Sequence, residues 1–217
     1  MVCLLVGVTT ALPQEYAPTQ TAPGTRPLRS IAADRVATIL PSDIHPLLTA
    51  SAMEDFLNRL DGGPPDWPKI YGAGHQDPGH DDRLFELNRK RDAARVGNPA
   101  LDRRIAFVWQ GELTHYDQKA GGFTVGIGPT LTPTRWGVVR FKPEDLPGNL
   151  IAVPNPQLRQ RLRRQFDHGR RIEISVLMTG RLVQEESLVY DFSHDQEGQG
   201  MIIPVVRVER VDLVLHP

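Results

Sequence analysis

Ile105-Ala-Phe107-Val-Trp109-Gln-Gly111-Glu-Leu113-Thr places apolar side chains at odd positions and mostly polar or small ones at even positions. A period of two indicates a β-strand with one buried face. Residues 116–122 end in two glycines and are typical of a turn, and the alternation then resumes over residues 123–127. The two runs therefore predict an antiparallel hairpin.

A helix is predicted further along, after the dense apolar run 136–141. Asn155 is a helix-capping residue type, and Pro156 suits the first helical position, where its missing N–H does no harm. Apolar residues then recur every four positions, and Gly169 supplies a left-handed end; these apolar residues are Leu158, Leu162 and Phe166.

Strand patterns return after this helix. Residues 172–178 alternate, residues 188–192 and 201–203 predict an extra hairpin, and residues 206–215 form the last strand. The apolar parity changes between Val208 and Val211, which predicts a β-bulge near Glu209 and Arg210.

Three strands, a helix and further strands resemble the OB-fold, a small, partly open barrel. The predicted fold class is α+β: a small antiparallel OB-like β-barrel with one inserted helix, preceded by a short helical N-terminal region. A β-sandwich is the alternative, but one well-capped helix between strands favours the barrel. The chain is also similar to an uncharacterised family of bacterial envelope proteins, a resemblance that implies no activity.

The N-terminal residues predict export. Val2 to Val8 are apolar and fit the hydrophobic part of a secretory signal, although no basic residue precedes them. A start codon assigned too far downstream would explain that gap, and a disordered or buried N-terminus is the alternative. The only cysteine, Cys3, lies in this segment, so no intramolecular disulfide can form. We expect a periplasmic or cell-envelope location.

The chain divides into three predicted regions. Residues 1–29 are a signal-like segment and a disordered, proline-rich tether, and residues 101–217 are the OB-like barrel. Residues 30–100 hold helical patterns and a linker, with helices expected at 30–40, 46–60 and 81–95. The second helix is expected to begin at Ser42 or Asp43, and Trp67 and Tyr71 are expected to pin the linker to the body.

Composition excludes several classes of function. A chain of 217 residues with 40% hydrophobic content can bury a full core, while a net charge of −1 creates no global field for polyanions. There is no P-loop, Rossmann fingerprint or paired-cysteine zinc motif. Ser193 and His194 are adjacent, so a strand would point them to opposite faces. We therefore predict no catalytic residues and no cofactor.

One polar loop could bind a metal. His75, Asp77 and His80 provide imidazole and carboxylate groups within six residues, and both are normal metal ligands. The alternative is a solvated loop in which Asp81 or a neighbour caps the following helix.

A basic face is predicted on the mid-chain helix. Its arginines lie opposite the apolar stripe and are Arg159, Arg161, Arg163 and Arg164. OB-folds bind single strands through a positive groove and stacking aromatics, which Tyr116 and Trp136 could supply. A solvated face and an anionic partner or lipid surface are the other interpretations.

The leading functional hypothesis is an exported, non-enzymatic binding module for an envelope protein or a small ligand, with peripheral membrane association as an option. The alternative from another class is a single-stranded nucleic-acid-binding protein, which the near-neutral charge and the predicted export disfavour. A weaker alternative is a metal-dependent hydrolase that uses His75 and His80.

Overall fold

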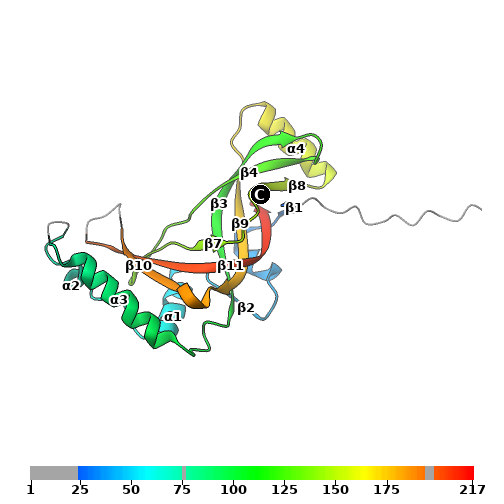
Figure 1. The fold of residues 1–217 in the computed structure, drawn as a ribbon. Coiled ribbons are helices and arrows are strands. Elements are labelled where there is room, and N and C mark those ends of the chain that lie inside the picture. The colour runs from blue at the N-terminus through cyan, green and yellow to red at the C-terminus, as the bar shows by residue number, and fades with distance from the viewer. Residues whose placement is uncertain (1–23, 75–76, 194–197) are drawn as a thin grey trace, which may run out of the picture.

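The computed structural model describes residues 24–74, 77–193 and 198–217. Its centre is a closed, six-stranded barrel (Figure 1). The strands are β1 (Thr25–Ser30), β3 (Arg104–Asp117), β4 (Gly122–Gly128), β8 (Leu150–Val153), β9 (Glu173–Leu182) and β11 (Gly200–Leu215). They pair in the order β1-β8-β4-β3-β9-β11, and β11 returns to β1. The barrel is compatible with the predicted OB-like architecture.

The barrel is mixed rather than purely antiparallel, so that part of the predicted fold class was wrong. The path from β8 through β4, β3 and β9 to β11 is antiparallel at every step, and its two end strands therefore run in the same direction. β1 fits between these ends and is parallel to both. It consists of residues 25–30, most of which were predicted from the sequence to belong to the tether.

Local patterns predicted the antiparallel pairs well. β3 and β4 form the expected hairpin, with Tyr116 opposite Phe123. The strand β10 (Leu188–Phe192) pairs with the start of β11 and confirms the extra hairpin. The register of β11 against β9 shifts between Val208 and Arg210, which confirms the predicted bulge.

The helix α4 (Pro156–Asp167) confirms the predicted inserted helix. The side chain of Asn155 caps it by accepting the Leu158 N–H at 2.9 Å. Leu158 and Leu162 are buried in the main core, and Phe166 packs against that core, with its ring 6.1 Å from the ring of Phe123. The apolar stripe of α4 therefore faces the barrel, as its four-residue spacing predicted.

A second, smaller cluster lies on the outer side of the barrel wall. Alternation sends Ala106 and Leu177 away from the barrel interior, where Val36 and Ile44 join them. Val36 belongs to the 3₁₀ helix η1 (Ala33–Ile39), and Ile44 to the short strand β2 (Ile44–Pro46), which pairs in parallel with β3. The segment after β1 therefore covers this wall.

Three helices lie at the end of the molecule opposite α4, beside the β10–β11 hairpin (Figure 1). They are α1 (Ala50–Asp61), α2 (Trp67–Tyr71) and α3 (His80–Arg95). The predicted start of α1 at Ser42 or Asp43 was wrong, because residues 44–46 pair with β3 and the hydroxyl of Thr49 caps the helix. The first predicted helix is the short η1.

The linker between α1 and α3 is pinned to the body as expected. Trp67 and Tyr71 are each 8% exposed, and Trp67 Nε1–H donates to the carbonyl oxygen of Trp136 at 2.6 Å.

Trp136 lies between two short strands, β5 (Thr132–Thr134) and β6 (Gly137–Val139). Both β6 and β7 (Lys142–Glu144) pair in parallel with β11. A 3₁₀ turn, η3 (Gln184–Glu186), precedes β10.

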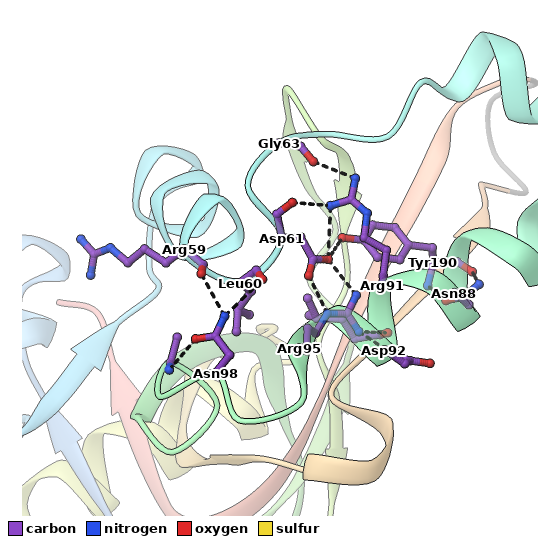
Figure 2. A network of polar contacts seen from close by, with 12 residues as sticks. Arg59, Leu60, Asp61, Gly63, Asn88, Arg91, Asp92, Arg95, Asn98 and Tyr190 are labelled. Atoms are coloured by element: carbon purple, nitrogen blue, oxygen red, sulfur yellow. Dashed lines mark hydrogen bonds and ion pairs between the residues drawn. The ribbon is translucent and has the colours of Figure 1, made fainter.

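A buried polar network joins α1, α3 and β10 (Figure 2). The carboxylate of Asp61, fully buried at the end of α1, accepts two hydrogen bonds from Arg95 at 2.7 Å each. Tyr190 donates its hydroxyl proton to the same carboxylate, and Arg91 Nη1 lies 3.5 Å from it. Burial, followed by the negative charge of Asp61, raises the pKa of Tyr190 strongly, so its hydroxyl stays protonated. Every charge in this network therefore has a partner.

Candidate functional site

The predicted arginines of α4 separate into two pairs. Arg163 lies over the ring of Tyr116, with its guanidinium carbon 4.9 Å from the ring centroid. Arg159 lies against Gly121 in the β3–β4 turn and donates to the carbonyl oxygen of Pro154 at 3.4 Å. These two arginines pack on the barrel, and Arg163 and Tyr116 are the predicted residues that the structure brings together.

The other pair faces outward. Arg161 and Arg164 line an open hollow of about 280 Å³ together with His168 and Arg170 from the end of the helix. Both arginines are exposed, and no carboxylate among the described residues forms an ion pair with either. The nearby Arg171 differs, because Glu112 and Glu173 neutralise it at 2.6 and 3.7 Å. The hollow can therefore accept an anion without first breaking an ion pair.

Trp136 belongs to the opposite end of the molecule. Its side chain is 1% exposed, and the guanidinium carbon of Arg91 lies 5.7 Å from its ring centroid. Phe123 is also fully buried, inside the barrel. The structure therefore offers Tyr116 as the aromatic beside the arginines and leaves Trp136 in the core.

The predicted metal loop is organised around an ion pair. Asp77 Oδ2 lies 2.7 Å from Arg83 Nη2, and Asp77 Oδ1 accepts the Gly79 N–H at 3.0 Å. The hydrogen bond from Arg83 lowers the pKa of Asp77 to about 2. His80 Nδ1 lies 2.9 Å from the Asp77 carbonyl oxygen, which accepts its proton. The acidic loop residue thus anchors α3 through Arg83.

Among the described residues, no three histidine, cysteine or acidic side chains gather as metal ligands. His75 lies outside these residues, as do His194 of the Ser193–His194 pair and the whole predicted signal segment. Asp81 lies in the first turn of α3, where its negative charge favours the helix dipole.

A pair of polar residues that sequence reasoning missed lies on the outer barrel wall. Ser175 Oγ lies 2.7 Å from His216 Nε2, and His216 Nδ1 lies 3.3 Å from the carbonyl oxygen of Ile31. They line a pocket of about 240 Å³ between β3, β9 and the segment after β1. Ser175 was predictable as an outward position of the alternating strand 172–178, but its partner is 41 residues away and no local motif joins them.

A larger hollow of about 480 Å³ adjoins this pocket, and Gln110 lines both. Its lining includes Gly126 and Gly128, which lack side chains, together with the charged residues Glu112 and Arg171. Ser175, Gln110 and Gly128 form one row across β9, β3 and β4, because Gln110 is the register partner of both others.

Comparisons of the chain with protein-family models, curated proteins and solved structures found no match.

Proposed function

We propose that the protein is an exported binding module that docks on an anionic lipid surface through Arg161, Arg164 and Arg170. The observation that carries the proposal is the lack of any acidic partner for these side chains among the described residues, although they gather around one hollow. Each arginine close to an anionic bilayer contributes about 1 kcal/mol to binding.

Several features support a lipid surface rather than a nucleic acid as the partner. Binding of single strands needs stacking platforms, and Phe123 and Trp136 are both buried. The guanidinium group of Arg163 already lies over the ring of Tyr116, where a base would have to stack. The apolar segment from Val2 to Val8 supports export, which would place the protein beside a membrane. No helix among the described residues is long and apolar enough to cross a bilayer.

Cosedimentation with vesicles tests this proposal. We expect binding to phosphatidylglycerol-containing vesicles, little binding to phosphatidylcholine vesicles, and weakening by added salt. Arg161→Gln with Arg164→Gln should reduce affinity roughly 30-fold, which corresponds to about 2 kcal/mol for two arginines. Arg140→Gln is the matched control, since Arg140 is exposed and forms no ion pair among the described residues but lies beside Ile202 in the hairpin region.

Equal binding to both kinds of vesicle, or an equal loss in the control variant, would refute the α4 surface. Binding of an oligothymidylate that both α4 substitutions weaken would instead favour the nucleic-acid alternative. Cell fractionation, with mass spectrometry of the N-terminus, tests export separately. An uncleaved cytoplasmic product would contradict that part of the proposal.

A further inference from the structure

The pocket beside Ser175 has an apolar body. Val36, Leu47, Leu48 and Met53 line it on the side of the N-terminal segment, and Val108 lines it on the side of β3. At about 240 Å³ it can enclose a small molecule but not a macromolecule. It lies on the outer barrel wall and shares no lining residue with the arginine hollow of α4, so a ligand here is independent of the proposed lipid surface.

The polar end of this pocket has a defined pattern of donors and acceptors. A carbonyl oxygen only accepts, so the contact with Ile31 requires that His216 Nδ1 carries a proton. In the neutral imidazole, Nε2 is then unprotonated and accepts the hydroxyl proton of Ser175. Ser175 Oγ therefore keeps its lone pairs for a ligand donor, and the imidazole fixes the direction of the hydroxyl.

Ser175 is the polar group that a ligand in this pocket would contact. Thr130 also lines the pocket, but its hydroxyl oxygen is shielded from solvent by the protein itself, so a bound molecule would not reach it.

The lining also defines the charge of the ligand. No Asp, Glu, Lys or Arg side chain contributes to this pocket. A charged group that left water here would lack a countercharge, whereas a hydroxyl or a primary amide can donate a proton to Ser175.

The site is suited to binding rather than to acyl transfer. Ser175 lies in β9 between two paired strands, opposite Gln110 of β3 and Val214 of β11. The ladder therefore uses the backbone N–H groups around Ser175, and none is left to stabilise an oxyanion.

We infer that this pocket binds a small, uncharged molecule with an apolar body and one amide or hydroxyl group. Hexanamide is a suitable probe, and hexanoate and hexylammonium are charged analogues of similar size. In an NMR titration, hexanamide should saturate the protein with a dissociation constant of about 1 mM. The largest shifts are expected at Val108, Gln110 and Ser175, and both analogues should bind at least roughly tenfold more weakly.

Two variants test the assignment to this pocket. Ser175→Ala keeps the side-chain volume nearly constant and should weaken hexanamide roughly tenfold. Thr132→Trp fills the pocket from a partly exposed position and should abolish saturable binding. Thr114→Ala is the control, because Thr114 lies in β3, which contributes Val108 and Gln110 to the pocket, but does not itself line it.

Failure to saturate by about 10 mM, or equal affinity for hexanoate, would overturn the inference. So would unchanged affinity in both pocket variants. None of these outcomes bears on vesicle binding, so the two proposals can fail separately.

Discussion

The side-chain amide of Asn88 forms hydrogen bonds with both main-chain groups of Tyr190. Its Oδ1 accepts the Tyr190 N–H at 2.8 Å, and its Nδ2–H donates to the Tyr190 carbonyl oxygen at 2.8 Å. Tyr190 lies in β10, whose paired strand is β11. Asn88 of α3 therefore satisfies the main chain of this strand in the way that another strand would, and it fixes the helix to the hairpin.

Replacement of Asn88 should destabilise the protein. Asn88→Ala removes both hydrogen bonds and leaves two main-chain groups without partners, so we expect a loss of about 2 kcal/mol in the free energy of unfolding. Asn88→Asp keeps the shape but places carboxylate oxygens against the Tyr190 carbonyl. Urea denaturation measures both. A change below about 0.5 kcal/mol in both variants would show that water replaces the lost contacts.

The buried network around Asp61 should be more sensitive. Asp61→Asn removes the negative charge and leaves Arg95, which is 2% exposed, without its main counterion. Breaking one side of a buried pair costs about 3–5 kcal/mol, which thermal and urea unfolding can measure. Asp92→Asn is the matched control, because Asp92 also pairs with Arg95 at 2.7 Å but is half exposed. Its expected cost is below about 1 kcal/mol, and equal losses would contradict the role of burial.

The contact of Trp67 with the hairpin requires glycine at position 200. A Cβ atom there would lie 1.7 Å from the indole ring of Trp67. Gly200→Ala should therefore displace Trp67, weaken its hydrogen bond to the Trp136 carbonyl and cost about 1–3 kcal/mol. Loss of the buried-indole fluorescence signal would accompany the change. Gly148→Ala is the control, because no atom lies within 4 Å of its Cβ position.

The Asp77–Arg83 ion pair gives a pH-dependent contribution to stability. The pKa of Asp77 falls to about 2 from its usual 3.8, so the folded state favours the carboxylate. The contribution is therefore present above about pH 4 and is lost as the pH falls toward about 2. Arg83→Gln should raise the pKa of Asp77 toward 3.8 in a carboxyl NMR titration. Arg89→Gln, an exposed position elsewhere on α3, should leave that pKa unchanged.

Features with a local signal could be predicted from the sequence. The β3–β4 hairpin, α4 with its Asn155 cap, and the bulge before Arg210 each depend on residues that are close in the chain. β1 has no such signal, because Leu28 is its only buried residue and its partners come from distant segments.

The candidate sites were harder to predict than the fold. The spacing of the α4 arginines gave their outward face, but not the packing of Arg163 on Tyr116. The approach of His216 to Ser175 depends on the register between β9 and β11, which the residues themselves do not encode locally.

The parallel position of β1 has a consequence for the kinetics of folding. β1 precedes every other barrel strand in the chain, whereas one of its two neighbours, β11, follows them all. The contact of Ile31 with His216 next to this seam spans 185 residues. Contacts of such long separation must overcome the loop-closure entropy of almost the whole chain, so barrel closure should be a late and slow step. An intermediate that has formed the antiparallel strands from β8 to β11 would expose the edges of β8 and β11 until β1 pairs with them. This intermediate is the species most prone to self-association.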